Sequence, residues 1–168
     1  VDVAIDGTVG REWNYRELLE TSETLAIALA SRFKPGERVV VWAPNIPEWL
    51  FMEYACALAG LVLVTANPSF QQKELRYVLE QSGAVALFLV DGFRGNPMAD
   101  IAKDAISGNQ SIREVVNLED ESALFMTGSL SKELPEVQPT DPAQIQYTSG
   151  TTGFPKGAVL SHYNLVNN

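Results

Sequence analysis

The sequence predicts an α/β fold, a three-layer αβα sandwich built around a mostly parallel, doubly wound sheet. Short runs that are apolar throughout recur along the chain, as in strands buried on both faces of a sheet. Stretches with helical spacing of apolar residues separate these runs, which is the alternation of βα units. Because crossovers between parallel strands are right-handed, the helices then cover both faces of the sheet.

The N-terminal part of the chain predicts a small hairpin followed by a helix. Residues 3–5 and 11–13 are short strand candidates joined by a glycine-rich turn. Asn14 has the side chain of an N-cap, and Glu17 completes a capping-box pair three residues later. Apolar residues then recur at helical spacing until Pro35 and the following glycine end the helix.

The middle of the chain predicts three further βα units and a last, weaker strand. The apolar runs of strand length are residues 38–42, 61–65, 84–90 and, more weakly, 112–118. The helices between them have start signals at Asn45, Ser69 and Asn96-Pro97 and stop signals at Gly60 and Gly83. The loops 43–45, 65–69 and 148–153 all follow strands, so we expect them to meet at the edge where such sheets bind ligands.

Composition excludes some classes of partner. The 168 residues carry 21 acidic and 12 basic side chains, a net charge of -9, which argues against nucleic acid or an anionic membrane surface. The single cysteine, Cys56, lies in an apolar helical run and is interpreted as a packing residue. The longest apolar run, residues 54–66, is too short for a transmembrane segment, and no secretory signal is recognised, so a cytoplasmic location is expected.

The chain is interpreted as one subdomain, residues 1–168, of a longer protein, because it lacks an initial methionine and stops where a helix begins. Residues 119–142 differ from the rest, since they combine an acidic cluster with several serines and prolines. We expect a mobile surface excursion there, with one short helical turn and no catalytic role.

The most informative stretch is Tyr-Thr-Ser-Gly-Thr-Thr-Gly-Phe-Pro-Lys-Gly, residues 147–157, here called the signature loop. Glycines let backbone N–H groups converge on an anion, hydroxyls donate further hydrogen bonds, and Lys156 supplies a compact positive charge. The spacing differs from a Walker A loop, in which the hydroxyl follows the lysine. A flexible linker is disfavoured because apolar strand-like runs flank the stretch; a generic phosphate loop is the open alternative.

The signature loop matches the motif of the adenylate-forming (AMP-binding) superfamily at every fixed position, and residues 158–165 resemble the fatty-acyl-CoA synthetase branch. The resemblance implies activation of a carboxylate by ATP and Mg²⁺, giving an acyl-adenylate and pyrophosphate, followed by thioester formation with CoA. By position it implies catalytic roles for Lys156 and Thr151. The implied nucleotide-binding residues are Thr148, Ser149, Gly150, Thr151, Thr152, Gly153 and Lys156.

The family's later motifs do not occur in these 168 residues. They hold the metal-binding glutamate, the ribose-binding aspartate, the hinge and the C-terminal lysine, so no metal ligand is predicted here and the isolated chain is expected to be inactive. Its partners are then ATP, a carboxylic acid and the remainder of its own polypeptide, with a homo-oligomer left open. Three alternatives also stay open: a kinase-like transferase, a non-catalytic phosphate-binding or dimerisation module, and another adenylating ligase such as an aryl-CoA ligase or a peptide-synthetase adenylation domain.

Other chemically interesting residues have structural interpretations. His162 is the only histidine and follows Ser161, an N-cap candidate. The resemblance implies that this position lies near the active site, so a secondary role there is a hypothesis. A nucleophile pair of Ser149 with His162 is disfavoured because no nucleophile elbow and no third orienting residue occur. The core or domain-face residues are expected to include Trp13, Trp42 and Trp49.

Overall fold

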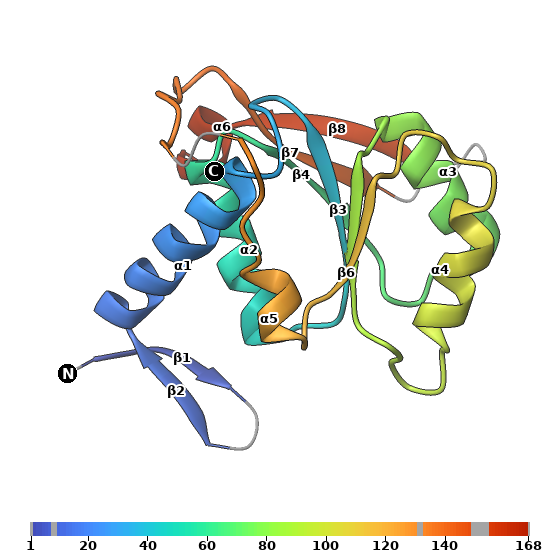
Figure 1. The fold of residues 1–168 in the computed structure, drawn as a ribbon, viewed down its shortest axis with the longest axis horizontal. Coiled ribbons are helices and arrows are strands. Elements are labelled where there is room, and N and C mark those ends of the chain that lie inside the picture. The colour runs from blue at the N-terminus through green and yellow to red at the C-terminus, as the bar shows by residue number, and fades with distance from the viewer. Residues whose placement is uncertain (1, 8–9, 131–132, 149–154, 168) are drawn as a thin grey trace.

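A computed structural model describes residues 2–7, 10–130, 133–148 and 155–167. Its main feature is a six-stranded sheet with the strand order β6-β5-β3-β4-β7-β8 (Figure 1). The strands are β3 (Arg38–Trp42), β4 (Val62–Ala66), β5 (Ala86–Leu89), β6 (Glu114–Asn117), β7 (Pro142–Thr148) and β8 (Lys156–Ser161). All neighbours pair in parallel except β8, which runs antiparallel to β7. The predicted mostly parallel, doubly wound sheet is therefore confirmed.

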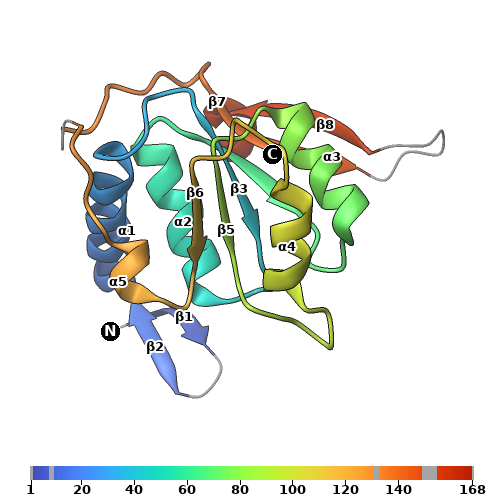
Figure 2. The ribbon, with the colours of Figure 1, turned by 45° about the vertical axis from the view of Figure 1, so that its right-hand side comes forward.

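Helices cover both faces of this sheet, as the three-layer prediction requires. Figure 2 shows one group on one side, α1 (Tyr15–Ala30), α2 (Pro47–Leu58) and the short α5 (Glu121–Leu124). The other side carries α3 (Gln72–Ser82) and α4 (Met98–Ile106), and α6 (His162–Val166) follows β8. No helix in the described part of the chain has the length and apolar character needed to cross a membrane.

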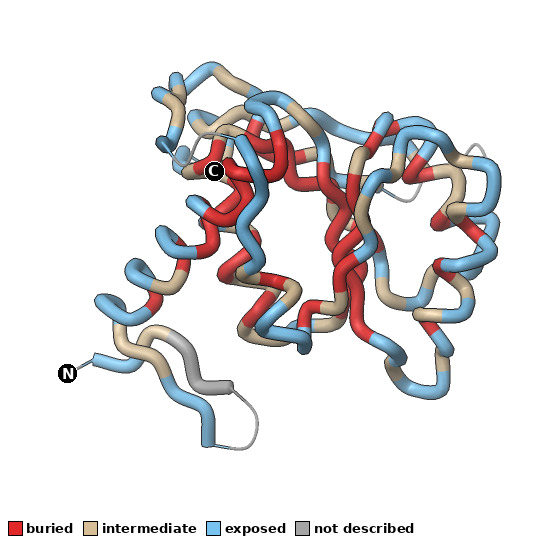
Figure 3. The backbone as a smooth tube through the Cα atoms, viewed as in Figure 1, coloured by how far each residue is buried: buried red, intermediate tan, exposed pale blue. Residues whose placement is uncertain are grey.

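The core lies where the strands meet the helices that cover them (Figure 3). In β3 every residue after Arg38 is buried, which explains why this strand has no polar face. Trp42 is fully buried, while Trp13 and Trp49 are half-buried and pack against the core. Cys56 is buried too, and burial, aided by the charge of Glu53, raises the pKa of its thiol. A packing role for Cys56 is consistent with this environment.

The N-terminal hairpin pairs β1 (Val3–Gly7) with β2 (Arg11–Asn14) outside the main sheet. It is joined to α2 by an ion pair from Arg11 to Glu48 and by an edge-to-face contact of Trp13 with Phe51, whose ring centroids are 5.3 Å apart. The predicted capping box is confirmed, because the Asn14 side chain accepts from two backbone amides at the start of α1 and Glu17 accepts from the Asn14 amide.

Two predicted helix caps are wrong. The N-cap of α2 is Ile46 rather than Asn45, because Pro47 forces the residue before it into an extended conformation. The N-cap of α3 is Gln71 rather than Ser69. The amide and hydroxyl of Ser69 both donate to the Asn67 side chain, at 2.9 and 2.6 Å, so that serine belongs to a turn before the helix.

The segment 119–142 contains the single helical turn that was predicted, α5, capped by Asp120. Its first half is tied to the end of α1. The Arg32 guanidinium donates to the Leu124 carbonyl at 3.0 Å, and the Gly128 amide donates to the Ser31 hydroxyl at 2.8 Å. The expectations of mobility and of no catalytic role stay predictions.

Candidate functional site

The candidate site lies at the carboxyl edge of the sheet, where β3, β4 and β7 end. These strands are neighbours in parallel register, with Trp42 opposite Ala66 and Thr65 opposite Gln146. The Trp42 indole donates to the Asn67 carbonyl at 2.8 Å and so joins the end of β3 to the loop after β4. The predicted meeting of these loops at one edge is therefore confirmed for the described residues.

Strands β7 and β8, which flank the signature loop in the sequence, form an antiparallel pair that ends at this edge (Figure 1). Of the predicted nucleotide-binding residues, the structure places Thr148 and Lys156, which are Cα partners at the last described pair of the hairpin. The remaining predicted members lie outside the described residues: Ser149, Gly150, Thr151, Thr152 and Gly153.

Lys156 and Thr148 are both exposed at the base of the loop. The Thr148 hydroxyl donates to the Lys156 carbonyl over 3.4 Å, a long contact. Among the described residues, no ion pair involves the Lys156 ammonium. An exposed ammonium beside a hydroxyl at the carboxyl edge is a donor set suited to a phosphate chain.

Two tyrosines pack together where α3 meets the hairpin. The Tyr77 ring from α3 meets the Tyr147 ring from β7 edge to face, with centroids 6.4 Å apart, and the Tyr77 hydroxyl donates to the Pro155 carbonyl at 3.1 Å. Burial, with a smaller contribution from neighbouring Tyr77, raises the pKa of Tyr147, so this phenol stays neutral at pH 7. Tyr77 was not among the predicted site residues, because no local signal connects it with a residue 78 positions away.

The described residues offer no metal site. No group of three or more histidine, cysteine, aspartate or glutamate side chains in the described ranges could hold a metal ion. Since Mg²⁺ prefers carboxylate oxygens in octahedral geometry, the described part of the edge does not by itself fit this ion.

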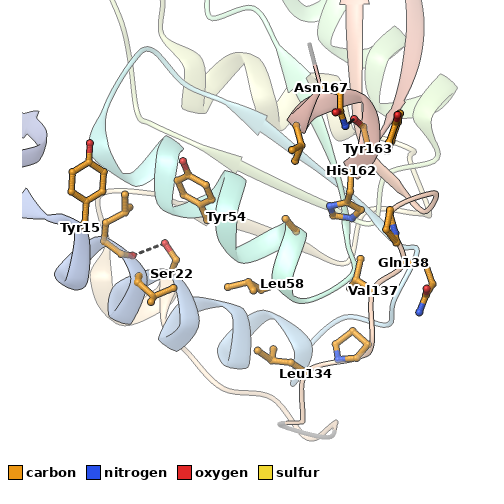
Figure 4. Close-up of a pocket in the computed structure, with 16 residues that line it drawn as sticks. Tyr15, Ser22, Tyr54, Leu58, Leu134, Val137, Gln138, His162, Tyr163 and Asn167 are labelled. Atoms are coloured by element: carbon orange, nitrogen blue, oxygen red, sulfur yellow. Dashed lines mark hydrogen bonds between the residues drawn. The ribbon is translucent and has the colours of Figure 1, made fainter.

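A cavity of about 850 Å³ lies elsewhere, and no residue of the signature loop is among those that line it. It is an apolar groove between α1, α2, α6 and residues 134–139 (Figure 4). Its lining includes Leu18, Tyr54, Leu58, Leu134, Val137, His162 and Val166. The groove has no signature in the sequence, because single exposed apolar residues are ordinary and only the packing brings these together.

His162 lies in this groove and not beside the loop (Figure 4). It follows the far end of β8, so it is separated from Lys156 by roughly 20 Å of extended chain. The predicted cap is confirmed, because the Ser161 hydroxyl accepts from the Asn164 amide at 3.2 Å. The hypothesis of a secondary role for His162 near the active site stays a prediction.

A doubly wound sheet with a polar, glycine-rich hairpin at its carboxyl edge is typical of one class of protein. This class is the α/β proteins that bind a phosphate-bearing ligand at that edge. A family model described as AMP-binding enzyme matches residues 2–168. The chain belongs to this family.

Relatives and solved structures agree with this assignment. The human medium-chain acyl-CoA ligase ACSF2, mitochondrial, is 34% identical over 160 residues, which cover 79% of this chain and 26% of that protein. The N-terminal domain of FACL13 from Mycobacterium tuberculosis matches with a TM-score of 0.75 and 26% identity, covering 92% of this chain and 39% of that one. VinN in complex with L-aspartate matches with a TM-score of 0.77 and 27% identity, covering 96% and 40%. The chain thus spans 26% of the length of the human relative.

Proposed function

We propose that these residues are the N-terminal part of an ATP-dependent acyl-CoA synthetase. In the first half-reaction a carboxylate oxygen attacks the α-phosphorus of ATP, and the bond from that phosphorus to the leaving pyrophosphate breaks. The thiolate of CoA then attacks the acyl carbon and releases AMP. The observation that carries the proposal is the complete signature loop, residues 147–157, whose base lies at the carboxyl edge in a member of the AMP-binding family.

The loop residues are proposed to hold the departing end of ATP. Lys156 offsets the negative charge that grows on pyrophosphate as the bond breaks, and Thr148 adds a hydroxyl donor at the base of the loop. Thr151 and Thr152 are proposed as direct phosphate contacts, with Ser149, Gly150 and Gly153 supplying hydroxyl and backbone donors. Family membership supports the use of ATP and CoA. Mg²⁺ is proposed as a further cofactor; its ligands are expected outside the described residues, so no step here depends on it.

The test is acid-dependent pyrophosphate release by the full-length protein that carries these residues, measured against a panel of carboxylic acids. We expect release with at least one aliphatic acid, and thioester formation when CoA is added. Transfer of the γ-phosphate with formation of ADP would favour a kinase-like transferase instead. Acyl-adenylate formation by residues 1–168 alone would contradict the expectation that this part is inactive by itself. The range of acids accepted separates the aryl-CoA ligase alternative from the acyl-CoA synthetase.

We further propose that the apolar groove is a contact surface for the rest of the same polypeptide. Val166 is 83% exposed and Tyr163 is 60% exposed, although both line the groove, and none of the residues of α6 is buried. A relative such as human ACSF2 has more than three times the length that this chain covers, so ample polypeptide exists to fill the groove.

The effect of Val166→Ser on stability tests this proposal. In residues 1–168 we expect a change within about 0.5 kcal/mol, because the side chain is largely exposed. In the full-length protein we expect a loss of about 1–2 kcal/mol, because a covered valine loses its apolar contacts. Denaturant unfolding of both proteins measures the difference, and equal effects would show that nothing covers this side chain.

The cytoplasmic location stays a prediction, and some relatives carry the word mitochondrial in their names. Cell fractionation of the source organism, with the protein detected in each fraction, tests the predicted location. Whether the protein forms a homo-oligomer is likewise open to measurement by analytical ultracentrifugation of the full-length protein.

A further inference from the structure

Tyr77, which lies outside the signature motif, contacts strand β7 and the residue that precedes strand β8. Tyr77 is in the middle of α3, a helix fixed at its start by Glu74, whose carboxylate accepts from the Gln71 amide, and at its end by Gly83 in a left-handed conformation. From this position the Tyr77 ring contacts Tyr147 in β7, and its hydroxyl donates to the carbonyl of Pro155 at 3.1 Å, one residue before β8. Figure 2 shows α3 beside β8.

The hydrogen bond from Tyr77 acts on the peptide group that joins Pro155 to Lys156. Proline has a fixed φ angle, so holding its carbonyl also sets the direction in which the chain enters Lys156. On the other side of Lys156 the backbone is fixed by close packing, since a Cβ added at Gly157 would lie 2.9 Å from Ile145 and 3.2 Å from the Tyr147 ring. The residues before and after Lys156 are therefore both held, while its ammonium stays exposed.

A lysine ammonium is a point charge on a flexible four-carbon stem. Its position therefore depends on how firmly the backbone of the lysine is held. The Thr148 contact to the Lys156 carbonyl is long, at 3.4 Å, and is a weaker restraint than the 3.1 Å bond from Tyr77. Tyr77 belongs to α3 and not to the hairpin itself. Its hydrogen bond therefore fixes the backbone before Lys156 relative to this helix, and not only relative to the neighbouring strand.

We propose that Tyr77 is a positioning residue for Lys156: through the Pro155 carbonyl it sets where the ammonium meets the phosphate chain of ATP. The inference rests on the proposed function, because it assumes that Lys156 binds this chain. It assigns Tyr77 to the ATP-dependent half-reaction alone. Loss of the Tyr77 hydroxyl should leave the KM values for the carboxylic acid and for CoA unchanged.

The test variant is Tyr77→Phe in the full-length protein, which removes the hydroxyl and keeps the ring against Tyr147. We expect kcat/KM for ATP to fall by about 3- to 10-fold, the effect of one hydrogen bond, with KM for the acid unchanged. Thr24→Val is the control for loss of a hydroxyl: Thr24 is exposed on α1, and its hydroxyl donates within the helix to the Glu20 carbonyl at 2.8 Å, so the variant should leave both constants unchanged.

A double-mutant cycle separates positioning from a general structural effect. If Tyr77 acts through Lys156, Tyr77→Phe in a Lys156→Ala background should change ATP affinity by less than about twofold, measured by isothermal titration. An equal loss in both backgrounds, or equal losses for ATP and for the acid, would overturn the inference while the proposed function stands. Wild-type protein that binds ATP and releases pyrophosphate, with no effect of Tyr77→Phe, would also overturn it. Wild-type protein that does not bind ATP would overturn both.

Discussion

Replacing Lys156 by alanine in the full-length protein is expected to lower acid-dependent pyrophosphate release by about 10²- to 10³-fold, the usual effect of removing one donor from developing charge. The physical reason is that Lys156 is the cation of the signature loop in a chain whose net charge is -9. In the proposed reaction, its loss removes one positive charge that offsets the charge growing on the leaving pyrophosphate. Steady-state rates at saturating acid and varied ATP measure the loss.

Two further variants make this result specific to Lys156. Lys103→Ala removes an exposed lysine of α4 that pairs with Asp100 at 2.9 Å, and it should leave the rate unchanged. Lys156→Arg keeps the charge but changes its geometry, so an intermediate rate is expected. If replacing Thr151, Thr152 and Lys156 together left nucleotide use unaltered, the loop would have no role in ATP binding and the proposed function would lose its main support.

Replacing Trp42 by alanine is expected to lower the free energy of unfolding by about 3–5 kcal/mol. Trp42 is fully buried at the end of β3, a central strand, and its indole donates to the Asn67 carbonyl at 2.8 Å. The substitution both opens a cavity and leaves a carbonyl without its donor. Urea unfolding followed by far-UV circular dichroism measures the loss.

Val115→Ala is the control for this experiment, because Val115 is 46% exposed on the edge strand β6. It should change stability by about 0.5 kcal/mol or less. Trp42→Phe keeps most of the apolar volume and loses the hydrogen bond. Its loss of unfolding free energy should therefore lie between those of Val115→Ala and Trp42→Ala. A loss below about 1 kcal/mol for Trp42→Ala would mean that the surrounding core collapses into the space, contrary to the packing described here.

Several parts of the fold could be predicted because they depend on neighbouring residues. The capping box of Asn14 with Glu17 is an interaction across three positions, and it occurs as predicted. The caps at Asn45 and Ser69 were wrong although their residue types are favourable. In one case Pro47 imposed the helix start one residue later, and in the other the Asn67 side chain captured the serine in a turn. Residue type alone does not determine a cap; the conformation of the flanking backbone does.

The candidate site was predictable in part for the same reason. The signature loop is a continuous stretch, so its family motif can be recognised without any structure. The residues that contact this stretch could not be predicted, since Tyr77 and Pro155 are 78 positions apart. The groove could not be predicted either, because its side chains come from α1, α2, α6 and residues 134–139. No spacing within a window of the sequence encodes such contacts.

The sequence by itself determined the alternation of buried strands with helices, the main turns and the motif of the signature loop. These features follow from side-chain periodicity and glycine or proline geometry, which act over a few residues. Only the tertiary structure decided that β3 lies between β4 and β5, that α3 faces the signature hairpin, and that His162 lies in an apolar groove roughly 20 Å along the chain from Lys156. The physical reason is that such neighbours are selected by the packing of the whole chain, where the burial of each face depends on all the others.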